Sequence, residues 1–156
     1  MTRAVLPSLT KFTFGGVSGE YLDDLMARIH LPQLDHVHLQ FFHHPTFDVP
    51  KLPQIVHRIE TFEPPFQAIV YFYDDSTDIS FYRKFGCISL ELQCTGLDNQ
   101  LSWLNKICPQ LVPFLSQTNF LELDHDAQDD QDSTLLLEFL RPFSAVKTLL
   151  IYRETH

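Results

Sequence analysis

A short spacing of apolar residues decides the fold, and it is clearest in Leu34-Asp35-His36-Val37-His38-Leu39. Leu34 is followed by a second apolar residue three positions on and by a third two positions after that. The spacing occurs six times along the chain, and Thr118 is the one member that is not apolar. The six sets are Leu9/Phe12/Phe14, Leu34/Val37/Leu39, Phe66/Ile69/Tyr71, Cys87/Leu90/Leu92, Thr118/Leu121/Leu123 and Val146/Leu149/Ile151.

This spacing is the L-x-x-L-x-L core of a leucine-rich repeat, in which each unit contributes one short strand. The sets are 25, 32, 21, 31 and 28 residues apart, a loose fit to the roughly 20 to 29 residues of such units. They predict an α/β fold, a degenerate leucine-rich-repeat-like open solenoid with parallel strands on the concave side and helices on the convex side. Residues 1–156 are expected to form a single domain that is a fragment of a longer repeat array.

Periodicity within each unit predicts where the strands and helices lie. Alternation of apolar residues predicts strands over 11–14, 36–41, 69–73, 79–82, 88–94, 120–123 and 148–152. Apolar residues three and four apart predict helices over 22–29, 52–59, 97–108 and 133–140, the last with Leu136, Leu137 and Leu140 facing inward. Gly15-Gly16 is expected to break the first strand. The third unit has no helical period, so we expect a β-meander there, with its middle strand on the convex side.

Composition narrows the classes of partner. Asp and Glu number 20 against 11 Lys and Arg, for a net charge of −9. This balance, without a basic cluster, disfavours binding to nucleic acid or to an anionic membrane surface. No apolar run approaches the roughly 20 residues of a membrane span, and the N-terminus lacks the apolar core of a signal peptide. Cys87, Cys94 and Cys108 are odd in number and sit among apolar residues, which favours buried thiols in an intracellular, cytoplasmic or nuclear protein.

Several stretches of the chain also carry a family likeness. They are Leu6-Pro7-Ser8-Leu9-Thr10-Lys11-Phe12-Thr13-Phe14, Val17 to Ile29, Leu31-Pro32-Gln33-Leu34-Asp35-His36, Phe47-Asp48-Val49-Pro50-Lys51-Leu52 and Leu140-Arg141-Pro142-Phe143-Ser144-Ala145-Val146-Lys147-Thr148-Leu149. Together they resemble the C-terminal, leucine-rich-repeat-like region of the F-box proteins of mushroom-forming (basidiomycete) fungi.

The resemblance implies a protein–protein interaction module, the substrate-recognition part of an F-box ubiquitin-ligase receptor. The helical F-box segment does not precede Leu6 in this sequence. Skp1 is therefore an expected partner only if a missing N-terminal F-box exists. A structural fragment of a longer repeat protein, without a binding function of its own, is the alternative. Such a fragment would expose its first strand, 11–14, as a bare apolar end.

The residues predicted to bind a protein partner come from the concave face. If the repeat register holds, each strand turns every second side chain toward that face. The predicted partner-binding residues are His36, His38, Gln40, Phe72, Glu91, Gln93, Phe120, Glu122 and Tyr152. In this register Tyr71 lies in the core and Phe72 is exposed.

The histidines raise a further alternative, a zinc-dependent site. His36, His38, His43 and His44 lie within nine residues, and His36 and His38 share one strand face. Two imidazoles can bind zinc if further ligands are added, and here a third ligand would have to come from an adjacent strand. We expect no metal and no cofactor, because outward polar positions on a strand explain both residues.

No pattern of a catalytic site is present. The acidic stretch Asp124 to Asp132 lacks the glycine and the terminal glutamate of a calcium loop, and we interpret it as a solvated loop before a helix. The five glycines have no phosphate-binding spacing, and no serine lies in a G-x-S-x-G elbow. The sequence therefore predicts a binding protein, not an enzyme.

Overall fold

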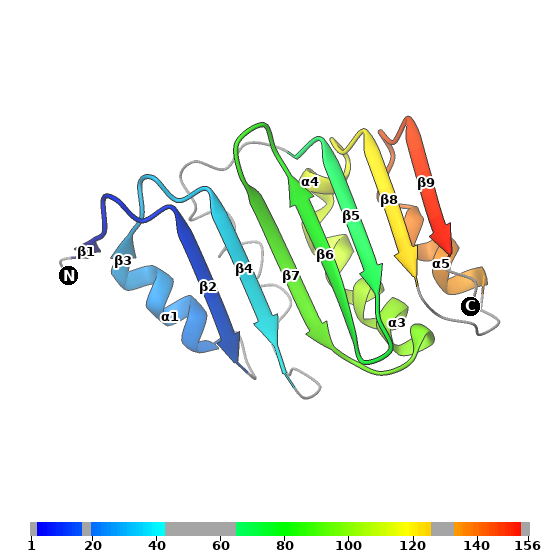
Figure 1. Cartoon of the computed structure of the whole chain (residues 1–156), viewed down its shortest axis with the longest axis horizontal. Coiled ribbons are helices and arrows are strands. Elements are labelled where there is room, and N and C mark those ends of the chain that lie inside the picture. The colour runs from blue at the N-terminus through cyan, green and yellow to red at the C-terminus, as the bar shows by residue number, and fades with distance from the viewer. Residues whose placement is uncertain (1–2, 17–19, 43–64, 126–132, 154–156) are drawn as a thin grey trace.

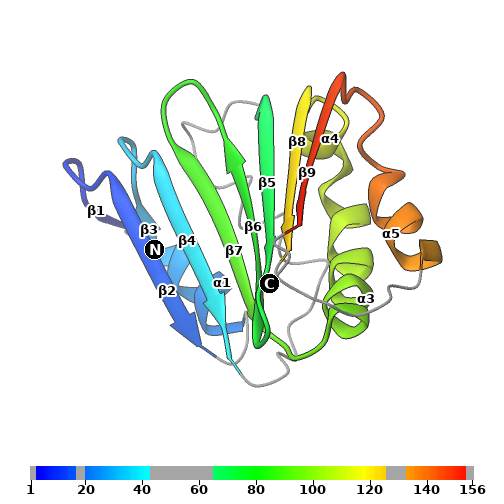
Figure 2. The same ribbon diagram turned by 45° about the vertical axis from the view of Figure 1, so that its right-hand side comes forward.

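The chain folds into an open β-sheet with helices against one of its faces (Figures 1 and 2). The computed structural model describes residues 3–16, 20–42, 65–125 and 133–153. The strands are β1 (Ala4–Val5), β2 (Lys11–Gly16), β3 (Ile29–His30), β4 (His36–Phe41), β5 (Gln67–Phe72), β6 (Ser76–Tyr82), β7 (Cys87–Gln93), β8 (Phe120–His125) and β9 (Thr148–Arg153). The helices are α1 (Glu20–Arg28), α3 (Leu97–Ile107), the 3₁₀ turn η1 (Cys108–Leu111), α4 (Val112–Leu115) and α5 (Ser133–Leu140).

Seven strands form the main sheet, in the order β2-β4-β7-β6-β5-β8-β9. Strand β6 is antiparallel to both of its neighbours, whereas all other neighbouring pairs are parallel. Strands β1 and β3 pair separately. The predicted α/β class is confirmed in this open, mixed sheet.

Three predicted helices, over 22–29, 97–108 and 133–140, are confirmed as α1, α3 and α5, and their apolar stripes cover one face of the sheet. The predicted helix over 52–59 lies outside the described residues. In α1, Leu22 and Met26 are buried four residues apart, as a helix facing a core requires. In α3 the buried apolar residues are Leu101, Leu104 and Ile107. In α5 the expected inward stripe is partly wrong, because Leu137 is 63% exposed and Phe139 is the buried residue. None of the helices in the described segments is long and apolar enough to cross a membrane.

The first strand does not end at its glycines. β2 continues through Gly16, and its pairs with β4 include Gly15 with Gln40 and Gly16 with Phe41. The expected break is wrong because ladder hydrogen bonds to β4 hold both glycines extended. A side chain at Gly15 would also meet the ring of Phe42, 3.2 Å from the position of its Cβ.

The third unit is the predicted meander, but the expected place of its middle strand is wrong. Strand β6 lies inside the sheet between β5 and β7, not on the convex side. The connections on either side of it span only residues 73–75 and 83–86. Connections this short join antiparallel neighbours in one sheet, whereas a parallel crossover needs a dozen residues or more. The chain therefore folds back twice, and β4 lies beside β7 instead of β5.

This order changes the register of the core. The repeat predicts one stack of Phe12, Val37, Ile69, Leu90, Leu121 and Leu149. The observed row runs across the sheet through Phe12, Val37, Ile88, Phe81, Ala68, Leu121 and Leu149. In β5 the side chains of Ala68, Val70 and Phe72 face the helices and are buried. The expected inward positions of Ile69 and Tyr71 are therefore wrong by one residue.

The last strand of the sheet is less covered than its neighbour. Leu149 and Ile151 of β9 are 43% and 56% exposed on the helix-side face, whereas Leu121 and Leu123 of β8 are buried. Phe12 and Phe14 of the opposite edge strand β2 are half-buried. Of the two edge strands of the main sheet, β9 therefore exposes more of its apolar side chains than β2, the predicted first strand.

Candidate functional site: the open face of the sheet

Among the residues that the structure describes, no helix lies against one face of the seven-stranded sheet, and Figure 1 looks onto that face. We call it the open face, and it corresponds to the predicted concave face. Strand pairing lines its side chains up in rows across the sheet. The central row is Gln40, Glu91, Asp78, Tyr71, Asp124 and Tyr152. The row beside it is His38, Ser89, Ser80, Ile69, Glu122 and Leu150.

Most of the predicted partner-binding residues lie on this face. His36, His38 and Gln40 project from β4, and Glu91 and Gln93 from β7, between buried apolar neighbours. Phe120, Glu122 and Tyr152 hold the corresponding positions of β8 and β9. Their role in binding stays a prediction.

Phe72 is the exception, and its expected exposure is wrong. It is 4% exposed and belongs to the hydrophobic core under the helices. Tyr71 takes its place on the open face, where its ring stacks on that of Tyr73 with centroids 5.9 Å apart. A partner that meets β5 therefore contacts tyrosine, not phenylalanine.

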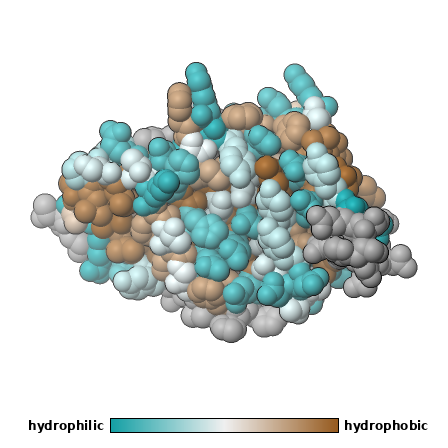
Figure 3. All heavy atoms as spheres, in the orientation of Figure 1, coloured by the Kyte–Doolittle hydropathy of each residue, from teal (hydrophilic) through white to brown (hydrophobic). Residues whose placement is uncertain are grey.

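The open face is acidic at its centre. Among the described strand residues, it carries four carboxylates and only one lysine, Lys11 on the edge strand β2. The carboxylates are Asp78, Glu91, Glu122 and Asp124. Figure 3 shows hydrophilic residues across the middle of this face.

The pKa values of the tyrosines near this face are raised, mainly by desolvation and to a smaller extent by nearby carboxylates. The pKa of Tyr71 is raised, first by desolvation and then by the negative charges of Glu122, Asp124 and Asp78. Desolvation also raises the pKa of Tyr73 and of Tyr82. All three phenols therefore stay protonated at neutral pH and can donate hydrogen bonds.

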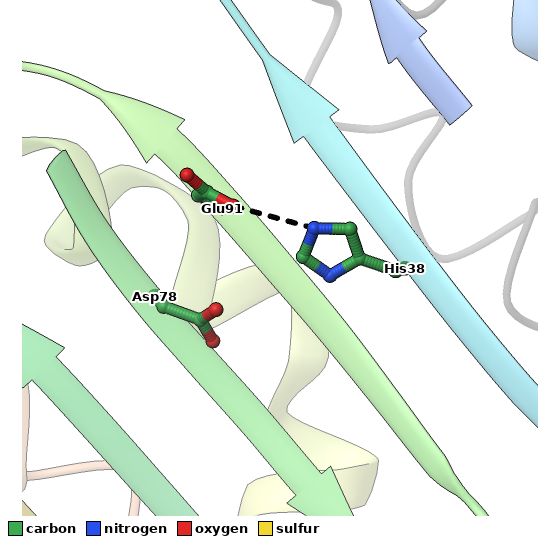
Figure 4. Close-up of side chains that lie close together, drawn as sticks. All are labelled: His38, Asp78 and Glu91. Atoms are coloured by element: carbon green, nitrogen blue, oxygen red, sulfur yellow. Dashed lines mark ion pairs between the residues drawn. The ribbon is translucent and has the colours of Figure 1, made fainter. Parts of the chain in front are cut away.

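The closest polar cluster consists of His38, Asp78 and Glu91, from the neighbouring strands β4, β6 and β7. Figure 4 shows the three side chains gathered over β7. His38 Nε2 lies 3.3 Å from Glu91 Oε2. One ligand atom from each residue can be chosen so that all three lie within 4.8 Å of one another.

Hydrogen bonds from two further side chains, Gln40 and Ser80, hold the two carboxylates of this cluster. Gln40 Nε2 donates to Glu91 Oε1 at 3.3 Å, which leaves Oε2 for His38. The Ser80 hydroxyl donates to Asp78 Oδ1 at 2.8 Å. Desolvation raises the pKa of Asp78 and Glu91 adds to the rise, whereas the Ser80 hydrogen bond and the charge of His38 oppose it.

The structure does not place His36 and His38 together as ligands of one site. His36 Nδ1 lies 2.6 Å from Asp35 Oδ1 and is outside the cluster. His43, His44 and the acidic residues 126–132 lie outside the described residues. Sequence reasoning missed Asp78, and period-two alternation in β6 was the one signal for it. Its nearness to His38 depends on the pairing of β4 with β7, which the spacing did not predict.

The thiols are not placed for nucleophilic chemistry. All three cysteines are free, and burial raises the pKa of Cys108 to about 12. Desolvation likewise raises the pKa of Cys87 and of Cys94. Because the thiolate is the reactive form, these cysteines suit a packing role.

A comparison of the chain with protein families, curated proteins and solved structures finds no match.

Proposed function

We propose that the chain is a protein-recognition module whose open face binds a partner segment that carries lysine or arginine side chains. The observation behind this proposal is the charge of the face: four carboxylates against Lys11 among the described strand residues. A surface of one sign attracts a partner of the opposite sign and repels nucleic acid. The function that we propose is therefore binding.

The aromatic side chains of the face support the same function. Tyr71 and Tyr152 lie in the same row as Asp78 and Asp124, and Tyr152 is 50% exposed. Tyrosine is enriched among the residues that dominate protein–protein binding energies. A basic segment laid across this row from Asp78 to Tyr152 meets carboxylates and phenol rings in alternation.

We interpret the fold as a degenerate leucine-rich-repeat-like solenoid. The parallel pairs β2–β4, β5–β8 and β8–β9 support this interpretation, because each unit of such a repeat adds one parallel strand. The meander β5–β6–β7 is its main departure. Combined with the resemblance to fungal F-box proteins, this favours the substrate-recognition part of a ubiquitin-ligase receptor.

Affinity capture from a fungal cell extract, quantified by mass spectrometry, tests the proposal. The face variant carries Glu122→Lys and Asp124→Lys, and the matched control carries Glu138→Lys on the exposed surface of α5. We expect the wild type and the control to recover the same proteins and the face variant to lose them. Recovery of ubiquitin-ligase subunits with them would support the receptor role. Equal recovery by all three proteins would contradict binding at the open face.

A further inference from the structure

The cluster of His38, Asp78 and Glu91 has the geometry of a metal site. Zinc bonds nitrogen and oxygen ligands at about 2.0 to 2.2 Å, so tetrahedral ligand atoms lie about 3.4 Å apart. His38 Nε2 and Glu91 Oε2 are already 3.3 Å apart. Asp78 completes the set, because one ligand atom from each of the three residues lies within 4.8 Å of the other two.

The charges of the cluster are unbalanced without a cation. Asp78 and Glu91 lie directly opposite each other on the antiparallel strands β6 and β7. Like charges at directly opposite positions destabilise a sheet. The lysine of this face, Lys11, pairs with His36 at the far end of β4. A divalent cation between the two carboxylates would balance both charges.

Hydrogen bonds from neighbouring side chains orient the proposed ligands, as hydrogen bonds to the ligand side chains do in metal sites. Gln40 binds the Glu91 oxygen that does not face His38. Ser80 binds Asp78 and also contacts Ser89 Oγ at 2.9 Å. The three ligands stand on three neighbouring strands, and a sheet positions side chains more rigidly than a loop does.

We propose that His38, Asp78 and Glu91 bind a divalent transition-metal ion, with Zn²⁺ as the best match, on the open face of the sheet. One imidazole and two carboxylates suit Zn²⁺, whereas Ca²⁺ and Mg²⁺ prefer oxygen ligands alone. His38 and Glu91 are partly exposed, with 34% and 25% of their side-chain surfaces accessible. The remaining coordination positions therefore face solvent and take water.

Calorimetric titration of the purified chain with ZnCl₂ tests this site without any protein partner, so its outcome is separate from that of the proposed function. We expect one Zn²⁺ per chain, with no comparable binding of MgCl₂ or CaCl₂. Glu91→Gln and His38→Gln each remove one ligand and should weaken zinc binding by at least about tenfold. His36→Gln is the matched control, because His36 lies two residues away on the same strand face but outside the cluster. It should bind zinc as the wild type does.

Asp78→Asn gives a variant that is expected to stay folded. It keeps the shape of the side chain and removes the like-charge pair with Glu91, so the metal-free variant should melt at or above the wild-type temperature. Added zinc should raise the melting temperature of the wild type and not that of Asp78→Asn. Absence of saturable zinc binding by the wild type would overturn the proposal. So would equal zinc affinity in the wild type, His38→Gln and Glu91→Gln.

Discussion

At the scale of single residues, Gly86 allows a close approach between the β6–β7 turn and the residue before β4. It lies in the turn between β6 and β7 with a φ of +113°, a conformation that favours glycine. A Cβ at this position would lie 2.0 Å from the carbonyl oxygen of Asp35. Cys87 N donates to that same carbonyl oxygen at 3.0 Å. A side chain at residue 86 would therefore push the turn away from the start of β4.

We expect Gly86→Ala to lower the free energy of unfolding by about 3 kcal/mol, because it adds backbone strain to a clash with main-chain atoms. Gly96→Ala is the matched control. Its φ is +83°, but the nearest atom to the added Cβ is 3.7 Å away, so strain alone should cost about 1 kcal/mol. Urea unfolding of both variants measures the difference, and equal losses would contradict the steric explanation.

The face of the sheet on which a side chain lies can be predicted from sequence only where polar and apolar residues alternate. In His36-Val37-His38-Leu39-Gln40 polar and apolar residues alternate, so the face of each side chain follows from its type. In Ala68-Ile69-Val70-Tyr71-Phe72 every residue can be buried. Packing against the helices then determines which alternate residues are buried, and the sequence pattern does not show which they are. The same ambiguity led to the wrong face for Phe72.

At the scale of elements, helix α3 holds the meander through one buried amide. Gln100 is 1% exposed on the apolar side of α3. Its Nε2 lies 2.7 Å from the carbonyl oxygen of Tyr73, 3.0 Å from that of Ser76 and 2.8 Å from that of Cys94. These carbonyls belong to the β5–β6 turn, to β6 and to the residue after β7. The contacts therefore fix all three strands against the helix.

Gln100→Leu should lower the free energy of unfolding by about 2 to 4 kcal/mol, because buried carbonyl oxygens lose their donor. Asn99→Leu is the control, since Asn99 makes one exposed hydrogen bond, to the carbonyl oxygen of Thr95. Its loss should stay below about 1 kcal/mol. Thermal unfolding followed by circular dichroism measures both variants. A loss for Gln100→Leu no larger than that for Asn99→Leu would show that the amide does not hold the meander.

The existence of the elements was predictable, and so were the parallel pairs β2–β4 and β8–β9, but the neighbours of β5 and β7 in the repeat were not. The apolar stripe of α3 and the alternation in β4 are local patterns that each element carries in its own sequence. The pairing of β4 with β7 is a contact between residues about fifty positions apart, and no local pattern encodes it. The cluster of His38, Asp78 and Glu91 was unpredictable for the same reason. These residues meet only because β4 pairs with β7 and β7 pairs with β6.

At the scale of the whole molecule, the helices divide the sheet into two surfaces with different roles. The covered face holds the hydrophobic core, and the open face carries the four carboxylates together with Tyr71 and Tyr152. The exposed apolar residues of β9, Leu149 and Ile151, lie on the covered side. They are therefore separate from the proposed binding face.

Selection of peptides from a random displayed library on the purified chain tests whether the open face recognises basic segments. We expect the peptides selected by the wild type to be enriched in lysine and arginine. Their affinity should fall at least about tenfold in the double variant Glu122→Lys and Asp124→Lys, the loss of at least one interfacial charge contact. It should be unchanged in Glu138→Lys. Selected peptides without basic enrichment, or with equal affinity for all three proteins, would contradict recognition by the open face.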